Sequence, residues 1–266
     1  MQHSLRTRNP RTRVRAAVCP FVLLCILLMP AARAAAQSNC DLQWLPGTGL
    51  SGVNGVVNAA TTWDPDGAGP LAPRLLIAGS FQSAGAVVAN NVVSFDPSGE
   101  TWSTLGGGTN SQVLALAALP DGDLIAGGSF TQAGGVNADR IARYSPTANT
   151  WSALGSGTNG PVRAVARMPN GDLIVAGSFT VAGGVPANSI ARFSPATNAW
   201  SALANGTNND VYALTVLPDG SLIAGGSFTM AGGIAARQVA RYFPATDSWQ
   251  PLGTGTNGVV RALLTL

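Results

Sequence analysis

The feature that most constrains this chain is a 49-residue repeat that runs through it four times. Three markers keep the same spacing from copy to copy: a phenylalanine, a tryptophan and a Thr-Asn pair. The phenylalanines are Phe81, Phe130, Phe179 and Phe228; the tryptophans are Trp102, Trp151, Trp200 and Trp249; the pairs are Thr109-Asn110, Thr158-Asn159, Thr207-Asn208 and Thr256-Asn257. A unit of this length cannot bury its apolar face alone, so neighbouring copies must stack and share a core.

Each copy predicts four short β-strands. An alternating strand is followed by a Pro-Asp-Gly or Pro-Asn-Gly turn, which is a strong hairpin signal. The second strand is continuously apolar, which predicts burial on both of its faces. An Ala-Gly-Gly loop then leads to a third strand, and the fourth strand opens on the repeat tryptophan. In the copy that begins at Val113, strands are expected over 113–116, 124–130, 141–144 and 151–154.

A second spacing links the repeat to a known family. In every copy an aromatic residue precedes the tryptophan by seven positions, as Phe95/Trp102, Tyr144/Trp151, Phe193/Trp200 and Tyr242/Trp249. With the preceding apolar run and glycines, this pattern resembles the blade of kelch-type β-propellers. The segments Gly-Gly-Ser-Phe-Thr and Ile-Ala-Arg are similar to repeats of fungal cortical cell-polarity marker proteins and of large exported bacterial repeat proteins. The resemblance covers residues 41–266 and implies an all-β, kelch-like propeller.

The repeats predict four complete four-stranded blades of 49 residues, flanked by single strands. A fourth-type strand precedes them around Trp44, and a first-type strand, 260–264, follows them. The first copy is longer because its turn expands to residues 64–74. The terminal strands either half-build a fifth blade or close the ring. Self-association that completes the ring, an open arc and a truncated reading frame are the alternatives, since an unclosed end exposes an apolar face.

Residues 1–36 read as a signal peptide. Five arginines form a positively charged start: Arg6, Arg8, Arg11, Arg13 and Arg15. An apolar stretch, 16–29, and a small-residue cleavage region near Ala36 follow. An uncleaved anchor is the alternative, but the stretch is short for a membrane span. We therefore expect residues 37–266 to form the repeat domain, without stable membrane insertion, secreted or held at the cell surface, with the periplasm as a further option.

The charge of the chain depends on this leader. Of its 15 basic residues, all arginine, six lie in residues 1–36, so nine basic and 12 acidic residues remain, and 9 − 12 gives a net charge of −3. A chain with this negative net charge gives no electrostatic argument for a nucleic-acid partner. Beyond the leader the chain has no histidine, no lysine and one glutamate, Glu100. A Ser–His–Asp triad or a zinc site cannot be built from this set, so we expect no enzyme activity, no metal site and no cofactor.

Two sets of repeated polar residues are the binding-face candidates. The Thr-Asn loops lie on one face of a repeat protein and offer hydroxyl and amide groups to a sugar. The alternative is that they satisfy hydrogen bonds of their own turns. Arg143, Arg192 and Arg241 recur on the third strand and could bind an anionic group. The alternative is that their stems cover a neighbouring blade. The repeat phenylalanines and tryptophans are expected to form the blade core.

The sequence thus predicts an exported binding or surface-interaction module whose partner is an unknown protein or carbohydrate. One alternative is a structural repeat segment of a larger surface or adhesin-like protein. Another is a calcium-dependent propeller enzyme, suggested by the Asp-x-Asp spacing of Asp64/Asp66 and Asp121/Asp123. These aspartates fall on hairpin turns, where turn geometry explains them without a metal.

Overall fold

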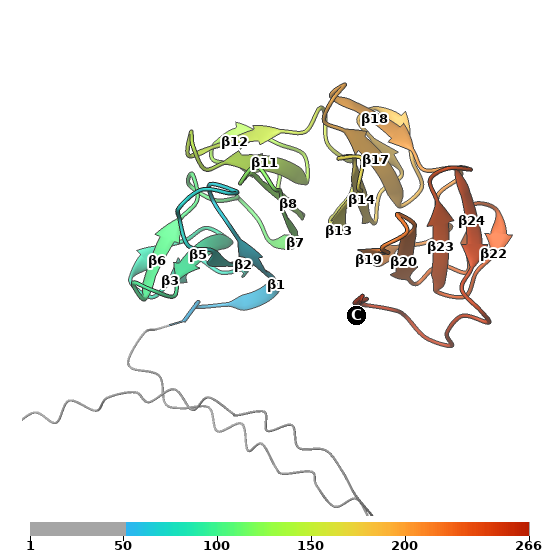
Figure 1. The fold of residues 1–266 in the computed structure, drawn as a ribbon, viewed down its shortest axis with the longest axis horizontal. Helices are drawn as coiled ribbons and strands as arrows, with labels where there is room; N and C mark the ends of the chain where they lie inside the picture. Colours follow the sequence, from blue (N-terminus) through green and yellow to red (C-terminus); the bar gives the residue numbers. More distant parts are fainter. Residues whose placement is uncertain (1–51, 266) are drawn as a thin grey trace, which may run out of the picture. The chain divides into compact units, whose positions relative to one another are not determined.

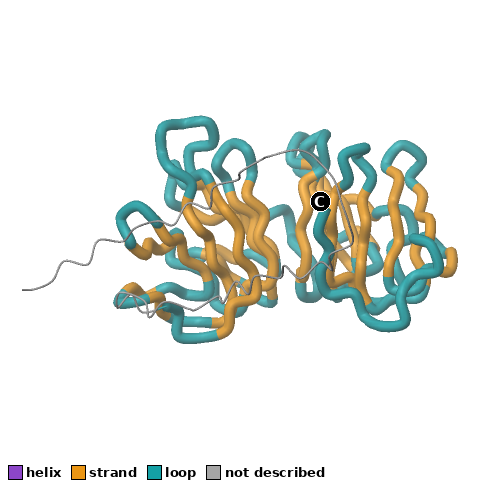
Figure 2. Tube along the Cα trace, turned by 60° about the horizontal axis from the view of Figure 1, so that its bottom comes forward, coloured by secondary structure: helices purple, strands orange, loops and turns teal. Residues whose placement is uncertain are grey.

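The computed structural model describes residues 52–265, and these fold entirely as strands, turns and loops, with no helix among them (Figure 2). The strands form four sheets of four antiparallel strands, which follow one another in chain order (Figure 1). We call these sheets blades 1 to 4. The all-β, four-bladed arrangement predicted from the repeat is confirmed.

Each blade is a meander in which the first strand is innermost and the fourth outermost. Blade 1 contains β1 (Val56–Trp63), β2 (Arg74–Ser80), β5 (Val92–Asp96) and β6 (Thr101–Thr104); blade 2 contains β7 (Val113–Ala118), β8 (Leu124–Gly128), β11 (Ile141–Ser145) and β12 (Thr150–Ala153); blade 3 contains β13 (Val162–Arg167), β14 (Leu173–Gly177), β17 (Ile190–Ser194) and β18 (Ala199–Ala202); blade 4 contains β19 (Val211–Val216), β20 (Leu222–Gly226), β23 (Val239–Phe243) and β24 (Ser248–Pro251).

A small hairpin interrupts each blade between its second and third strands. Here the sequence predicted only an Ala-Gly-Gly loop. The hairpins are β3/β4 (Ser83–Ala84, Val87–Val88), β9/β10 (Gln132–Ala133, Val136–Asn137), β15/β16 (Val181–Ala182, Val185–Pro186) and β21/β22 (Met230–Ala231, Ile234–Ala235). The glycine pair forms the turn, and Gly134 and Gly135 both take a positive φ, +57° and +79°, which glycine adopts without a steric penalty.

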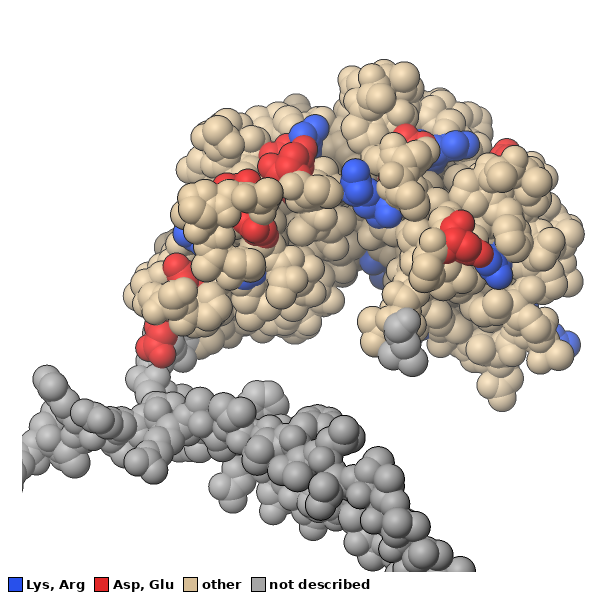
Figure 3. Space-filling view, viewed as in Figure 1, with Lys and Arg blue, Asp and Glu red and all other residues tan. Residues whose placement is uncertain are grey.

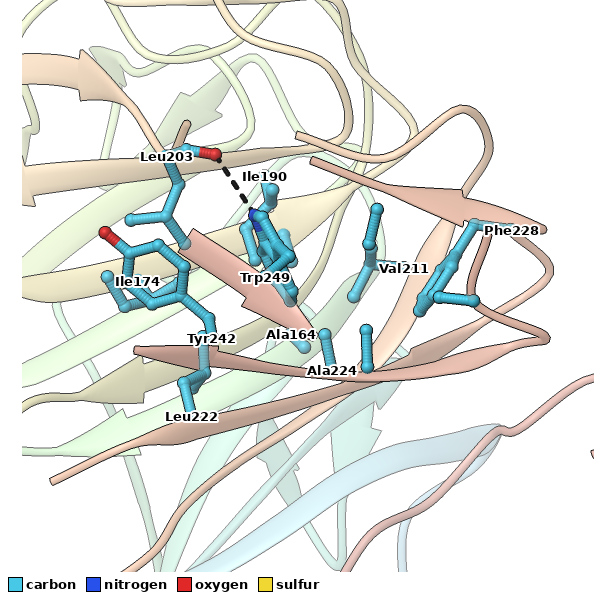
Figure 4. Close-up of a cluster of buried hydrophobic side chains, with 14 of the residues drawn as sticks. Ala164, Ile174, Ile190, Leu203, Val211, Leu222, Ala224, Phe228, Tyr242 and Trp249 are labelled. Carbon is cyan, nitrogen blue, oxygen red and sulfur yellow. Dashed lines mark hydrogen bonds between the residues drawn. The ribbon is translucent and has the colours of Figure 1, made fainter. Parts of the chain in front are cut away.

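The core lies between the blades. All five residues of β8, β14 and β20 are buried, as the continuous apolar pattern predicted. One hydrophobic cluster joins blades 1 and 2, a second joins blades 2 and 3, and a third joins blades 3 and 4. The repeat phenylalanines are buried, and so are Trp151, Trp200 and Trp249, whereas Trp102 of blade 1 is half-buried. Figure 4 shows Trp249 packed among such residues at the junction of blades 3 and 4.

The expanded turn of blade 1 packs against the turn of blade 2. Trp63, which ends β1, is buried, and its indole nitrogen donates to the carbonyl of Gly122 at 2.6 Å. A Cβ on Gly122 would lie 2.5 Å from the Pro65 carbonyl oxygen, so the two backbones touch. The extra residues therefore extend the contact between two blades, with Trp63 filling a place that leucine or methionine holds in the other copies.

The segment after blade 4 packs like the first strand of a further blade. The Val260 amide donates to the Gly226 carbonyl at 3.1 Å, and its side chain meets Gly225, as Val162 of blade 3 meets Gly127 of blade 2. The predicted signal peptide and the strand around Trp44 fall in residues 1–51, outside the described residues. Within the described part of the chain, no helix is long and apolar enough to cross a membrane.

Candidate functional site

The antiparallel blades present two sets of connections at opposite ends of their strands (Figure 2). We call the end with the small hairpins and the Thr-Asn loops the loop face. The end with the Pro-Asp-Gly turns and the connections between third and fourth strands is the turn face. The two sets of candidate polar residues separate cleanly, because the Thr-Asn pairs belong to the loop face and the arginines point to the turn face.

Three of the four repeat asparagines, Asn110, Asn159 and Asn208, tie their loops to the next hairpin. The Asn110 side-chain oxygen accepts from the Thr131 and Gln132 amides at 2.9 and 3.0 Å, and its amide donates to the Thr131 hydroxyl at 2.9 Å. Asn159 and Asn208 repeat these three bonds with residues 180–181 and 229–230. The three side chains are exposed, yet most of their hydrogen-bonding capacity is used within the blade.

Each repeat threonine stabilises its own turn. The Thr109 hydroxyl donates to the Ser111 carbonyl at 2.8 Å, and Thr158, Thr207 and Thr256 make the same bond two residues along. Thr109, Thr158 and Thr207 are buried. Polar side chains from the preceding blade reach their carbonyls, since Asn91 donates to Thr109 and Arg140 to Thr158. These threonines therefore join neighbouring blades, and the exposed asparagines are the groups that face solvent.

Asn54 completes this series, and the sequence reasoning missed it. Its side-chain oxygen accepts from the Gln82 and Ser83 amides at 2.9 and 3.0 Å, the same pattern as Asn110. Asn54 precedes Asn110 by 56 residues instead of 49, because the expanded turn lies between them. This copy has Val53-Asn54 where the others have Thr-Asn, so the Thr-Asn marker does not identify it. An alignment of the copies that allowed for the insertion would have placed Asn54 in the series.

The largest hollow on the loop face is a groove between blades 1 and 2. Its volume is about 970 Å³, and the equivalent grooves at the later junctions measure about 300 and 380 Å³. Its lining has no charged residue and is dominated by amides and hydroxyls, including Asn54, Gln82, Asn90, Asn110, Gln112 and Gln132. The groove between blades 2 and 3 differs, since Asp139 and Arg140 line it and pair at 3.4 Å. The hydrogen bonds across these junctions make the loop face continuous from blade to blade.

The repeat arginines pair with the aspartates of their own turns. Arg143 binds Asp123 through Nε and Asp121 through Nη2, the latter at 3.2 Å. Arg241 binds Ser221 through Nε at 2.9 Å and Asp219 through Nη2. Figure 3 shows positive and negative side chains as adjacent patches on an otherwise uncharged surface. Arg192 departs from this pattern, since its nearest carboxylate, Asp172, lies 4.0 Å from Nη1.

The pKa values of the turn carboxylates Asp219 and Asp64 shift in opposite directions because their surroundings differ. Hydrogen bonds from the Ser221 hydroxyl and amide, aided by Arg241, hold the pKa of Asp219 below its usual value. Blade 1 has Ser94 where the other blades have arginine. There the shared hydrogen bond with Asp66, followed by desolvation, raises the pKa of Asp64. No group of three or more His, Cys, Asp and Glu side chains is placed to hold a metal among residues 52–265.

Comparison with known families agrees with this architecture. Residues 103–219 match the family described as the Rax2 C-terminal beta propeller domain. Residues 217–245 match a beta-propeller domain of unknown function, DUF5122. The repeat region is a β-propeller. No curated protein matches the chain.

A further polar cluster lies on the innermost strands of the propeller. Each first strand carries a β-bulge near its start, and Arg163 and Tyr212 occupy this position in blades 3 and 4. The guanidinium groups of Arg163 and Arg261 lie 5.1 and 5.4 Å from the centre of the Tyr212 ring. Arg163 also donates to Ser178 at 2.9 Å. Sequence reasoning passed over this position because its residue type changes from copy to copy.

Proposed function

We propose that this chain is an exported, non-enzymatic propeller that binds a neutral carbohydrate in the loop-face groove between blades 1 and 2. The observation that carries the proposal is the composition of that groove. A volume of about 970 Å³ lined by amides and hydroxyls, with no charged side chain, suits the hydroxyl groups of a sugar. Ligand sites in proteins are concave and few per protein, and the largest well-formed hollow is the first candidate. This favours the groove between blades 1 and 2 over the two smaller ones.

Several sequence features support the export and the absence of catalysis in this proposal. Residues 1–36 have the charge, apolar stretch and small residues of a signal peptide. Beyond them there is no histidine, the most frequent general base, and no lysine. In every copy an aromatic residue precedes the tryptophan by seven positions, as in kelch-type propeller blades. The regular recurrence of this spacing supports a kelch-like repeat.

A second candidate function is that of a repeat segment within a larger surface protein. The observation that favours it is the exposed side of blade 1. Val57 is 46% exposed, although the equivalent Val113, Val162 and Val211 are fully covered by the preceding blade. A further blade or a second copy of the chain would cover this side in the same way.

A glycan array probed with the purified protein tests the carbohydrate proposal. The variant Gln82→Thr/Gln132→Val places in the groove the residues that blade 3 carries at the equivalent positions, Thr180 and Val181. It should fold normally and lose at least tenfold in glycan affinity. Met230→Gln, which adds an amide at the equivalent exposed site of blade 4, is the matched control and should bind as the unaltered protein does. Absence of any glycan signal, or equal binding by the groove variant, would overturn the proposal.

A further inference from the structure

A second hollow lies on the turn face, between blades 3 and 4. Its volume is about 350 Å³, within the range of small-molecule sites. Its wall is mainly apolar and includes Met168, Ile174, Leu203 and Tyr242. Figure 4 shows Ile174, Leu203 and Tyr242 lying together in one cluster. Arg192 also lines this hollow, which we call the turn-face pocket.

The equivalent arginines show what Arg192 lacks. In blades 2 and 4, Nη2 binds the first residue of the turn pair, Asp121 or Asp219, and Nε binds the second, Asp123 or Ser221. In blade 3 the first residue is Asn170, which has no negative charge. Asparagine replaces the carboxylate poorly at an arginine, because its amide has no charge and only one acceptor oxygen.

Asn170 also shares the remaining carboxylate of the turn, Asp172, with Arg192. Its amide donates to Asp172 Oδ2 at 2.9 Å, and that same oxygen lies 4.0 Å from Arg192 Nη1. Arg192 Nε is buried and has no hydrogen-bond partner within the described part of the chain. The side chain is 33% exposed and forms part of the pocket lining. A guanidinium offers five donors, and here they are largely unused.

Two carboxylates, Asp172 and Asp219, also line the pocket, and Asp219 is already satisfied. Asp219 pairs with Arg241 and accepts from the Ser221 hydroxyl at 2.6 Å. The Tyr242 hydroxyl donates to Asp247 at 2.6 Å, outside the pocket lining. Burial, followed by this hydrogen bond, raises the pKa of Tyr242, so it remains neutral. The second carboxylate of the lining, Asp172, accepts from the Asn170 amide. Arg192 is therefore the one cation lining the described pocket.

We propose that the turn-face pocket binds a small organic carboxylate with an apolar body. The carboxylate takes the place at Arg192 that Asp121 and Asp219 hold at their own arginines. Arginine binds carboxylates through paired, charge-assisted hydrogen bonds, which gives both strength and geometry. The apolar body lies against Met168, Ile174 and Tyr242. This site is on the opposite end of the strands from the loop-face groove and does not depend on it.

Titration calorimetry of the purified protein with 3-phenylpropionate and with its uncharged amide, 3-phenylpropionamide, tests the charge requirement. We expect the carboxylate to bind with one site per chain and the amide to bind at least tenfold more weakly. Equal affinity, or no binding of the carboxylate up to millimolar concentration, would overturn the proposal. This comparison uses the unaltered protein, so it does not depend on the folding of any variant.

The variant Asn170→Asp tests the position. It recreates the Asp-Gly-Asp turn of blade 2, and its new carboxylate should occupy Arg192 and weaken 3-phenylpropionate binding at least tenfold. The melting temperature should not fall, because blade 2 already carries this turn. Asn137→Asp adds the same charge to an exposed hairpin on the loop face and should leave binding unchanged. Unaltered binding by Asn170→Asp would refute the assignment, and glycan binding by Asn170→Asp should be unaffected.

Discussion

At the scale of the residue, the repeat tryptophans differ in one hydrogen bond. The indole nitrogens of Trp151, Trp200 and Trp249 donate to the carbonyls of Leu105, Leu154 and Leu203 in the preceding blade, at 2.8, 3.0 and 3.4 Å. The Trp102 nitrogen is equally buried but has no acceptor among residues 52–265. The same side chain is thus a bridge between blades in three copies and an unsatisfied donor in the first described copy.

This contrast predicts unequal costs for the same substitution. Trp151→Phe removes the bond and leaves the Gly108 amide as the remaining donor to the Leu105 carbonyl, and it also removes part of a buried ring, so the unfolding free energy should fall by about 2–3 kcal/mol. Trp102→Phe removes a donor that had no partner and should cost less than about 1 kcal/mol. Urea denaturation of both variants measures the difference. Equal losses would show that packing of the ring, and not the hydrogen bond, accounts for the tryptophan at this position.

At the scale of the element, the two hairpin glycines, Gly134 and Gly135, are required for different reasons. Both adopt a positive φ, but Gly134 alone also lies too close to its neighbours to carry a side chain. A Cβ on Gly134 would lie 2.8 Å from Trp151 Cδ1 and 2.7 Å from the Gly106 carbonyl oxygen. A Cβ on Gly135 would meet nothing within 4 Å. The first glycine lets the hairpin approach the tryptophan of its own blade, and the second serves only the turn.

Alanine at the two positions should therefore have different effects. Gly135→Ala should cost about 1 kcal/mol, the strain of a left-handed conformation for a residue with a side chain. Gly134→Ala carries the same strain and a clash with two neighbours, so its cost should be about 1–3 kcal/mol greater. Thermal unfolding followed by circular dichroism gives both values. A larger loss for Gly135→Ala would contradict the close approach of hairpin and tryptophan.

The elements also show how far sequence reasoning reaches. The four strands, their turns and the buried second strand follow from local signals: alternation, Asp-Gly turns and continuous apolar runs. The small hairpins escaped because two-residue strands have no periodicity to detect. The pairing of Arg143 with Asp121 and Asp123 also escaped, because it depends on the third strand lying against the second, in a register where Arg143 opposes Ile125. Asn54 was hidden by the insertion within blade 1.

At the scale of the whole molecule, blade 1 exposes the surface that the other blades bury. Val57 and Leu75 are 46% and 36% exposed, while their equivalents in the other blades, Val113, Val162, Val211, Leu124, Leu173 and Leu222, are at most 1% exposed. The contact that covers those residues is the same at every junction, with a valine of one blade against the glycine or alanine of the blade before it. A surface shaped for another blade is therefore available on blade 1.

We expect a second copy of the chain to cover this surface, with the exposed Val259 and Leu264 beyond blade 4 as the complementary apolar groups. Sedimentation velocity at increasing protein concentration should show association. Val57→Asp should weaken it at least tenfold, because a charge would be buried without a partner. Val88→Asp is the control, since Val88 is 70% exposed on a hairpin whose equivalent residues are exposed in blades 2, 3 and 4 as well. A protein that stays monomeric at all concentrations would exclude the second copy as the partner of blade 1, and an equal effect of the two aspartates would place the contact elsewhere.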